Sequence, residues 1–415
     1  MMRPNASSKT ARTVDIVLVA NFTATSGTGN CRFLDIAHRL TALGANVEVV
    51  TSDFEHDFHT LRALPLPKTD FKITLVHEPG YTKNISVKRL LSQHVFGRNI
   101  AKFLRSRPTV PDLIYCATPP PVVASNCAAF AKQHGTAFVV DVQDLWPEAF
   151  GMRFKAPTAL TWIFFRMIQA SRFAYRQADA VLGVSQSYVD HAQRTARRAL
   201  PTSVVFLGTS LADYAQHAQH NESPIETDCT KLVYAGTLSH SYDLPMVMDA
   251  MANLEHEDPR FQRLELTVLG DGPKRKDFEK YAEQLSIKTR FLGKLQYPAM
   301  VRELQDADIA VNPIVAGSAG SILNKVGDYA AAGLPVINTQ ESIEYRRLLD
   351  SYAAGVNCRS ENSSDVAEAI RNLVDNPQRR AMMGCNSRRM AEELFDRDKT
   401  YAELANNILS LAQAN

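Results

Sequence analysis

The chain has 415 residues, of which 45% are apolar, and a formal net charge of +2. This length and apolar content suffice for two hydrophobic cores, and the near-neutral charge provides no global field for binding nucleic acid. Six cysteines without any C-x-x-C pair argue against a disulfide framework and against a structural zinc site. Together with the lack of an apolar run of membrane-spanning length, these features predict a soluble, cytoplasmic protein.

Apolar segments of strand length alternate with helix-period segments through the first half of the chain. Strands are expected at 14–20, 46–52, 72–78, 112–118, 137–144 and 180–185, with helices at 31–44 and 120–135 between some of them. Strands that are apolar almost throughout are typical of a parallel sheet covered by helices on both faces.

The same pattern restarts after a polar stretch. Residues 212–229 read as a linker, and further strands are expected at 231–237, 264–272, 289–295, 308–315, 334–339 and 353–358. The chain is therefore predicted to be an α/β protein with two tandem Rossmann-like, doubly wound domains, at 1–211 and 230–395. We expect the domains to face each other across a cleft at the carboxyl ends of both sets of strands.

Glycine-bearing loops follow the first strand of each half. Gly27 and Gly29 precede a helix expected near Asn30, and Gly236 and Thr237 occupy the same position in the second half. Glycines let the backbone approach a ligand at a helix N-terminus, where an anion is the natural guest. A dinucleotide site is disfavoured because the third glycine of that fingerprint is missing; the simpler alternative is a pair of tight turns.

The segment 320–339 reads as a turn, a short helix and a buried strand. Ser321 is expected to cap the helix and Gly333 to close it, with Asn324, Lys325 and Asp328 on its polar side. An exposed Lys–Asp pair that only solvates the helix is one interpretation. The other is a sugar-nucleotide site, with the cation on the diphosphate and the carboxylate on ribose hydroxyls.

The sequence resembles the GT-B glycosyltransferases of family four, retaining enzymes that build bacterial surface polysaccharides. The resemblance rests on "LNKVGDYAAAGLPVI", "FLGKL", "DADIAVNP" and "VLGDGP" for the donor-binding half, and on "DVQDLWPEAF" for the acceptor-binding half. It extends over nearly the whole chain, and it implies that the final helix, expected at 396–415, crosses back to the first domain.

The resemblance implies a set of substrate-contacting residues. Lys325 would be the main cation on the donor diphosphate, with a catalytic role, and Asp328 would bind the ribose. The full set of expected substrate-binding residues is Gly27, Gly29, Arg32, Gly236, Thr237, Gly293, Gly320, Ser321, Ile322, Asn324 and Asp328.

The sequence departs from the family pattern at two places. Gly320 stands where the first Glu of the family's Glu-x7-Glu element is expected. Thr237, Ser239 and His240 stand where the family has an Arg and a Lys after the first strand of the donor domain. The phosphate site is therefore expected to be less cationic than usual.

Neither a metal nor a cofactor other than the nucleotide diphosphate co-substrate is expected. The Asp-x-Asp triplet Asp306 to Asp308 ends a predicted helix and enters a strand, which favours a structural role. On the acceptor side, Asp144 is predicted to be a catalytic polar residue, with Glu148 as an alternative. Trp146 and Pro147 beside them also suit a purely packed turn.

Two acid-free basic segments suggest contact with a membrane. Basic residues interleaved with aromatic ones are typical of helices that lie on an anionic membrane surface; the alternative is a core-facing helix with a solvated basic face. The basic residues are Lys83, Lys88, Arg89, Arg98, Lys102, Arg105 and Arg107 in the first segment, and Arg153, Lys155, Arg166, Arg172 and Arg176 in the second.

The sequence thus predicts a metal-independent, retaining glycosyltransferase that uses a nucleotide-sugar donor and a lipid-linked glycan acceptor. It would be cytoplasmic, with peripheral attachment to the inner face of the cell membrane. A sugar-nucleotide epimerase of the same fold and a catalytically silent binding subunit remain alternatives, the latter because the first Glu and the usual phosphate cations are missing.

Overall fold

A computed structural model describes residues 12–24, 31–84, 86–146, 158–218, 229–317 and 322–414. The chain divides into two compact units. Unit 1 comprises residues 1–183, 188–204 and 401–415, and unit 2 comprises residues 184–187 and 205–400.

Unit 1 is built on a seven-stranded parallel sheet with the order β5-β2-β1-β6-β7-β8-β9. The strand order reverses between β1 and β6, which makes this pair the switch point of a doubly wound sheet. The strands are β1 (Asp15–Val19), β2 (Asn46–Ser52), β5 (Lys72–Val76), β6 (Leu113–Thr118), β7 (Ala137–Val142), β8 (Ala180–Gly183) and β9 (Thr202–Val204). A small hairpin, β3 (Phe54–Glu55) and β4 (Thr60–Leu61), follows β2 and was not predicted.

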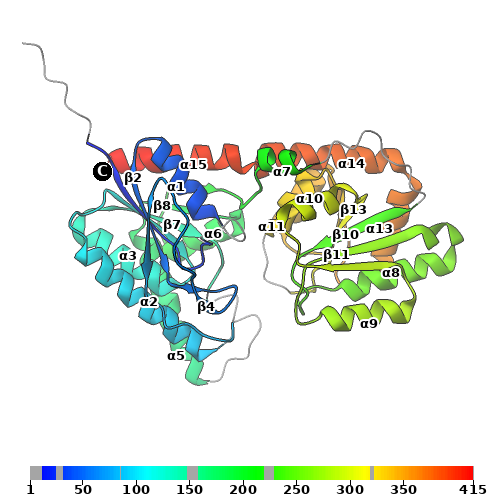
Figure 1. The fold of residues 1–415 in the computed structure, drawn as a ribbon, viewed down its shortest axis with the longest axis horizontal. Coiled ribbons are helices and arrows are strands. Elements are labelled where there is room, and N and C mark those ends of the chain that lie inside the picture. Colours follow the sequence, from blue (N-terminus) through cyan, green and yellow to red (C-terminus); the bar gives the residue numbers. More distant parts are fainter. Residues whose placement is uncertain are drawn as a thin grey trace, which may run out of the picture. The chain divides into compact units, whose positions relative to one another are not determined.

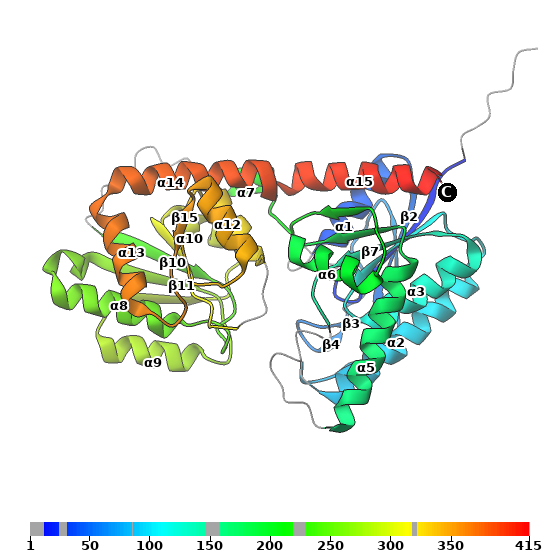
Figure 2. The same ribbon diagram turned by 180° about the vertical axis from the view of Figure 1, so that it is seen from behind.

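Helices cover this sheet because its central strands are apolar on both faces. Every residue of β6 and β7 is buried, as expected for a parallel sheet with helices on both sides. The helices α2, α3 and α5 pack side by side along one face (Figures 1 and 2). The helices of unit 1 are α1 (Arg32–Ala42), α2 (Val87–Ser106), α3 (Pro121–His134), α5 (Thr158–Gln177) and most of α6 (Gln186–Ala196).

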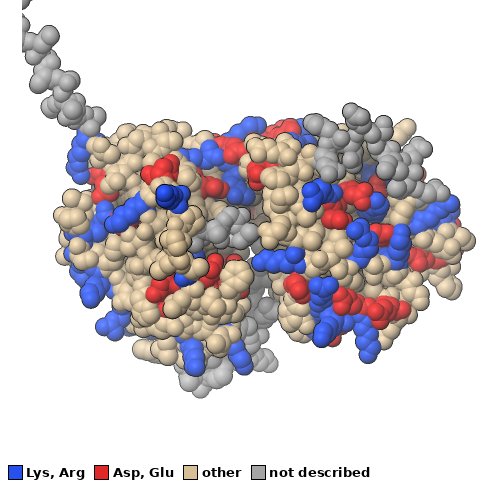
Figure 3. Space-filling view, viewed as in Figure 1, with Lys and Arg blue, Asp and Glu red and all other residues tan. Residues whose placement is uncertain are grey.

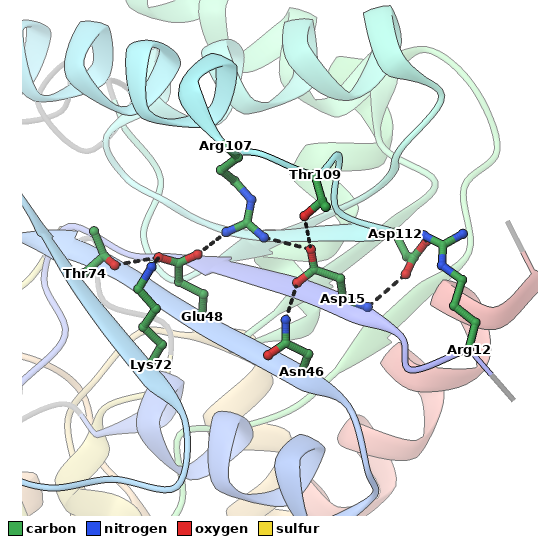
Figure 4. Close-up of polar contacts among 9 residues, drawn as sticks. All are labelled: Arg12, Asp15, Asn46, Glu48, Lys72, Thr74, Arg107, Thr109 and Asp112. Carbon is green, nitrogen blue, oxygen red and sulfur yellow. Dashed lines mark hydrogen bonds and ion pairs between the residues drawn. The ribbon is translucent and has the colours of Figure 1, made fainter. Parts of the chain in front are cut away.

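Paired charges close the amino edge of the unit 1 sheet (Figure 4). The Arg107 guanidinium, whose side chain is almost fully buried, lies 2.7 Å from Asp15 at the start of β1 and also pairs with Glu48 on β2. Lys72 at the start of β5 reaches the same Glu48 at 2.8 Å. Burial alone would raise the pKa of Glu48, but the hydrogen bonds from Lys72 and Thr74 and the Arg107 charge hold it below its usual value.

Unit 2 is a second doubly wound unit with a six-stranded parallel sheet, β12-β11-β10-β13-β14-β15. Its switch point lies between β10 and β13. The strands are β10 (Thr230–Ala235), β11 (Leu264–Leu269), β12 (Thr289–Gly293), β13 (Ile309–Asn312), β14 (Val336–Asn338) and β15 (Gly355–Asn357). The helices are α7 (Leu211–His217), α8 (Leu244–Glu257), α9 (Arg275–Leu285), α10 (Tyr297–Gln305), α11 (Asn324–Ala331), α12 (Ile343–Tyr352), α13 (Ser363–Asp375) and α14 (Pro377–Met390).

Strand alternation sorts the apolar side chains of unit 2 into two cores. Leu232 and Tyr234 of β10 belong to the core that packs on α8 and α13. Val233 and Ala235, on the opposite face of the same strand, belong to the core that packs on α10, α11 and α12. All the strands predicted from the sequence are present, so the two-sheet α/β fold is confirmed.

The predicted linker differs from the structure in its first part. Residues 212–217 belong to α7, whose N-terminus is capped by the Ser210 hydroxyl, which accepts a hydrogen bond from the backbone of Asp213. Leu211 and Tyr214 are buried three residues apart, and this helical spacing is hidden in an otherwise polar segment. The last helix, α15 (Arg397–Ala414), begins in unit 2 and belongs to unit 1 from Tyr401 onward.

Candidate functional site

The candidate site in unit 2 lies at the carboxyl end of β10, beside the switch point. Ligands of doubly wound sheets bind at such points, because the loops of the two flanking strands diverge there. Gly236, the first residue after β10, has a φ of +148°, which favours glycine. A Cβ atom at Gly236 would lie 3.7 Å from the Lys325 ammonium nitrogen, so the loop and the α11 side chain meet here.

Lys325 is a buried cation that stands against two aromatic rings. The residue is 8% exposed, and its Nζ lies 4.2 Å from the ring centre of Tyr234 and 4.3 Å from that of Tyr242. Within the described parts of the chain, this Nζ has neither a hydrogen-bond partner nor a carboxylate in ion-pair distance. Burial lowers the pKa of Lys325 well below its usual value, while the two ring faces favour the charged form. A ligand anion at Nζ would supply the missing countercharge.

Tyr329 fixes α11 to the switch point. Its hydroxyl accepts a 2.7 Å hydrogen bond from the backbone N–H of Ala235 at the end of β10. The helix itself begins at Asn324, with Leu323 as its N-cap, and Gly333 follows its end at a φ of +68°. The expected closure at Gly333 is confirmed, whereas the expected cap Ser321 lies outside the described residues.

Asp328 is partly buried and does not pair with Lys325. Its carboxylate accepts a hydrogen bond from Thr209, which precedes α7, and lies near Arg397, the first residue of α15. Burial raises the pKa of Asp328 to about 6, although that hydrogen bond and the Arg397 charge act in the opposite direction. The interpretation of Lys325 and Asp328 as an exposed, solvating pair is therefore wrong, because the two side chains have separate, buried surroundings.

Two glycine loops dock against each other beside Lys325. A Cβ atom at Gly270, after β11, would lie 1.9 Å from the carbonyl oxygen of Gly236, and one at Gly272 would lie 2.3 Å from that of Leu238. No side chain fits in that space, so both glycines are required for the backbones to approach. The Leu238 N–H donates to Asp271 O at 2.9 Å, which ties the second loop to the first.

The other expected donor-site residues are dispersed. Gly293 is buried on the outermost strand β12, where its carbonyl accepts the Gly270 N–H at 2.8 Å, so the structure shows it supporting the loop beside Lys325. Thr237 is exposed and its carbonyl accepts the Tyr234 hydroxyl; Asn324 is exposed at the first turn of α11, and Ile322 packs against the adjacent core. Gly27, Gly29, Gly320 and Ser321 lie outside the described residues.

A buried amide cluster at this edge of the sheet was not predicted. Asn312 at the end of β13 donates to Asn338 at the end of β14 at 2.9 Å, and Asn338 donates to Asn357 at the end of β15 at 2.9 Å. The sequence does contain a signal, because three consecutive strands of unit 2 each end in Asn. The cluster joins the three carboxyl ends that lie beyond the switch point.

The Asp-x-Asp triplet lies at the opposite edge of the sheet from Lys325. Asp306 forms a 2.6 Å ion pair with Lys231, and Asp308 accepts the backbone N–H of Lys231 at 2.8 Å. Both carboxylates thus fasten the amino end of β10 to the start of β13, as the structural interpretation predicts.

In unit 1, Arg32 does not occupy a substrate site. Its Nε lies 2.7 Å from Asp141 on β7, both side chains are fully buried, and its guanidinium stacks 5.0 Å from the ring centre of Tyr401 on α15. The expectation that Arg32 binds substrate is corrected by this placement, because a buried bidentate ion pair leaves its charge neutralised. The sequence could not reveal a partner 109 residues away.

Asp144 uses both carboxylate oxygens locally. One accepts the Leu145 N–H at 2.8 Å, and the other accepts the Trp146 indole N–H at 3.0 Å. Burial raises the pKa of Asp144, while these hydrogen bonds and the charge of Arg89 act against the rise. This arrangement is that of a packed turn which still leaves the carboxylate at the carboxyl end of β7. Glu148 lies outside the described residues.

The comparisons with known proteins agree with this architecture. A glycosyl transferase 4-like domain model matches residues 27–208, and a glycosyl transferases group 1 model matches residues 215–390. The chain is a GT-B glycosyltransferase of family four. The two matches coincide with the two doubly wound halves, and the second contains Lys325 and both docked glycine loops.

Solved structures with the same fold cover nearly all of this glycosyltransferase. Sucrose-phosphate synthase from Thermosynechococcus elongatus aligns with a TM-score of 0.72 and 15% identity over 97% of this chain and 100% of that one. HepE of Anabaena in complex with UDP aligns with a TM-score of 0.70 and 16% identity over 96% of this chain and 100% of that one. WaaG, a glycosyltransferase involved in lipopolysaccharide biosynthesis, aligns with a TM-score of 0.66 and 15% identity over 95% of this chain and 99% of that one.

A curated relative matches over a shorter stretch. It is a GDP-mannose-dependent monoacylated alpha-(1-6)-phosphatidylinositol monomannoside mannosyltransferase from Corynebacterium glutamicum, 27% identical over 132 residues. The match covers 31% of this chain and about a third (34%) of that protein.

Replacement of Lys325 should separate ligand binding from stability. We expect Lys325→Met to weaken nucleoside diphosphate binding by about tenfold to a hundredfold, because the diphosphate would lose a desolvated cation. The melting temperature of the ligand-free protein should not fall, since the variant removes a buried charge without a countercharge and Met still packs on both tyrosine rings. Calorimetric titration and thermal unfolding measure the two effects. Lys276→Met, at an exposed position of α9, is the matched control, and unchanged affinity in Lys325→Met would contradict the assignment.

The ionised Asp328 carboxylate should lower the free energy of unfolding at neutral pH. Its pKa of about 6 in the folded protein exceeds the value near 4 of an unfolded chain, so folding opposes its ionisation. Stability should therefore fall as pH rises from about 4 to about 6 and stay lowered above that, by roughly 3 kcal/mol in total. Asp328→Asn should lack this loss, so its stability advantage over the native protein should grow across the same pH interval. Denaturant titrations from about pH 4 to 8 measure this, with the exposed Glu283→Gln as control. A pH-independent difference would refute it.

Proposed function

We propose that the protein transfers a sugar from a nucleotide diphosphate sugar to a lipid-linked glycan acceptor, without a metal ion and with retention of anomeric configuration. The observation that carries this proposal is the buried Lys325 ammonium, which stands on two tyrosine rings at the switch point with no protein countercharge among the described residues. A donor diphosphate is the anion that family membership and position both favour.

The chemistry follows from the charge that develops on the leaving group. When the sugar–phosphate bond breaks, negative charge grows on the diphosphate, and a preorganised cation in a desolvated site stabilises it. Lys325 supplies this cation, and the positive end of the α11 dipole adds to it. Asp328, one helical turn further along α11, would accept hydrogen bonds from the ribose hydroxyls.

Metal independence is supported by the ion pair and the hydrogen bond that the carboxylates of the triplet Asp306 to Asp308 already form. Asp306 and Asp308 hold Lys231 at the amino edge of the sheet, whereas Lys325 lies at the carboxyl edge. A diphosphate at Lys325 would therefore lie across the sheet from this triplet.

The activities and ligands of relatives support the substrate classes. HepE has been solved with UDP and with UDP-glucose, WaaG acts in lipopolysaccharide biosynthesis, and the curated relative is a mannosyltransferase acting on a phosphatidylinositol mannoside. A nucleoside diphosphate leaving group and an acceptor with a lipid anchor are consistent with all three.

Peripheral membrane contact is supported by exposed apolar side chains on two helices of unit 1. Val87 and Leu91 are exposed in the first turns of α2, and Trp162 and Phe165, at 66% and 54% exposure, are near the start of α5. Helices that follow parallel strands run antiparallel to them, so both helices start at the carboxyl edge of the sheet. Across the described residues, no helix combines the length and apolarity that crossing a bilayer requires.

Basic side chains accompany this apolar surface. Along α2, the exposed residues His94, Arg98 and Lys102 continue the stripe that begins with Val87 and Leu91. Figure 3 shows Lys and Arg along the outer border of unit 1 with few acidic residues among them. Two of the basic residues predicted for this surface do not belong to it, because Arg89 is buried and Arg107 is held in the ion pairs of the amino edge.

A panel of nucleoside diphosphates tests the function. We expect one of UDP, GDP, ADP or TDP to bind by calorimetry at least about tenfold more tightly than the others, and the matching sugar nucleotide to be hydrolysed slowly without acceptor. EDTA should leave hydrolysis unchanged. Conversion of the donor into its sugar epimer would instead identify an epimerase, and nucleotide binding without hydrolysis or transfer to any lipid-linked glycan would identify a silent subunit.

Vesicle sedimentation tests the membrane surface. The protein should sediment with vesicles that contain phosphatidylglycerol and dissociate as salt rises above physiological strength, because screening weakens attraction to the anionic surface. The double variant Trp162→Ser/Phe165→Ser should partition at least about tenfold more weakly, since two apolar side chains are lost from the interface. Ile343→Ser, which removes an equally exposed apolar side chain from unit 2, is the matched control. Equal sedimentation of all three proteins would contradict the proposed surface.

A further inference from the structure

Unit 1 contains a second buried cation that has no ion-pair partner among the described residues. Arg89, in the first turn of α2, is 9% exposed, and its guanidinium carbon lies 4.4 Å from the ring centre of Trp146. It lies 5.5 Å from the ring centres of both Phe22 and Tyr81. One terminal nitrogen donates to the carbonyl of Asn84 at 2.8 Å, whereas Nε has no hydrogen-bond partner in the described structure.

The acids nearest to Arg89 are committed to neutral donors. The two oxygens of Glu78 accept from Asn21 at 2.7 Å and from Ser92 at 2.8 Å. Asp144 accepts from the Leu145 backbone and from the Trp146 indole, as described above. Both carboxylates attract Arg89 electrostatically, but neither is within ion-pair distance among the described contacts.

The histidine near Arg89 is neutral and adds no second positive charge. His56 Nδ1 lies 2.5 Å from the Tyr81 hydroxyl. Burial, and then the charge of Arg89, lowers the pKa of His56 to about 4, so this ring is neutral at physiological pH. Burial likewise raises the pKa of Tyr81 to about 12, which keeps its hydroxyl protonated. Among the described residues, the groups that contact Arg89 are therefore aromatic faces and neutral polar groups, and no carboxylate forms an ion pair with it.

A purely structural role explains this arrangement poorly. A guanidinium that only filled the core would lose hydration without gaining a carboxylate, and stacking on aromatic rings offsets only part of that loss. The contrast with Arg32 in the same unit is direct, because Arg32 is also buried and has Asp141 as a bidentate partner. The surroundings of Arg89 are those of an anion-binding group.

The position of the cluster matches a ligand site. Phe22 follows β1, His56 follows β2, Tyr81 follows β5 and Trp146 follows β7, so four carboxyl ends of one parallel sheet contribute to it. Aromatic faces of this kind also stack on the apolar faces of sugar rings. Val87 and Leu91, which are exposed in the adjoining turns of α2, put the cluster beside the apolar surface proposed to meet the membrane.

We propose that Arg89 anchors an anion-binding subsite of unit 1 that takes a phosphoryl group carried by the acceptor. The identification of this ligand as the acceptor rests on the proposed function, whereas the binding of a phosphoryl group does not. The phosphoryl group has two candidate sources, the headgroup of a lipid-linked glycan and a soluble sugar phosphate, which share their recognition by a guanidinium fork.

Tryptophan fluorescence reports on the site directly. The chain has two tryptophans, so Trp162→Phe leaves Trp146, whose ring contacts the Arg89 guanidinium, as the single emitter. Lys325→Met in the same protein removes the cation proposed for the donor diphosphate. Titration of this double variant with inorganic pyrophosphate, glucose 1-phosphate and farnesyl diphosphate should give saturable changes, whereas methyl glucoside should give none. Tighter binding of farnesyl diphosphate than of pyrophosphate identifies a lipid-borne group, and equal binding identifies a soluble phosphate.

Variants at position 89 complete the test. Added to the double variant, Arg89→Gln should weaken phosphoryl binding by about tenfold or more, and Arg89→Lys should retain part of it, because Lys keeps the charge but not the fork. Arg194→Gln, at an exposed position of α6 in the same unit, should have no effect. The proposal is overturned if pyrophosphate and methyl glucoside act alike on the protein with Arg89 intact, or if Arg89→Gln binds unchanged. Because no donor is present, these outcomes are separate from success or failure of the nucleotide panel.

Discussion

The contact between the Lys325 ammonium and the faces of Tyr234 and Tyr242 is the interaction on which the proposed donor site depends. The quadrupoles of the two rings stabilise a cation in a desolvated site without neutralising its charge. The surrounding backbone is adapted to this contact. Tyr329 locks α11 onto β10, and the glycines at 236, 270 and 272 allow two loops to meet where any side chain would collide.

Charged side chains at the two edges of each sheet differ in whether they form ion pairs. At the amino edges, charges are paired: Arg107 with Asp15 and Glu48 in unit 1, and Lys231 with Asp306 in unit 2. At the carboxyl edges, Lys325 and Arg89 are buried against aromatic rings and have no ion-pair partner in the described structure. Paired charges fix strand ends, whereas an unpaired buried cation is costly unless a ligand completes it. The pairing of charges thus distinguishes the structural amino edges of the sheets from the carboxyl edges that are candidate ligand sites.

Asp328 extends the same argument to a carboxylate. Burial keeps its pKa near 6 although Thr209 and Arg397 are close, so the folded protein carries a charge at neutral pH that its environment disfavours. Perturbed ionisable groups of this kind concentrate at functional sites, where stability is sacrificed for binding. Lys325 and Asp328 lie on one short helix with different partners, which suits two different groups of one extended ligand.

The sequence by itself determined the fold and pointed to the segment that contains the proposed donor site. Near-continuous apolar strands, their alternation with helices and the glycines after the first strand of each half are local patterns, and such patterns follow directly from backbone and side-chain preferences. The segment 323–337 likewise points to Lys325 and Asp328 through its residue pattern alone. The small hairpin β3–β4 and the helix α7 were not predicted, because short segments of mixed polar and apolar residues have weak hydrophobic periodicity.

Only the tertiary structure decided which charges are available to a ligand. Arg32 and Arg89 look alike in the sequence, yet Arg32 forms an ion pair with Asp141, 109 residues away, whereas Arg89 contacts aromatic rings and has no ion-pair partner among the described residues. Lys325 and Asp328 likewise have the spacing of an exposed helical pair, and the fold buries them with separate partners. The physical reason is that burial and pairing depend on contacts between segments far apart in the chain, and no local pattern encodes a partner at that distance.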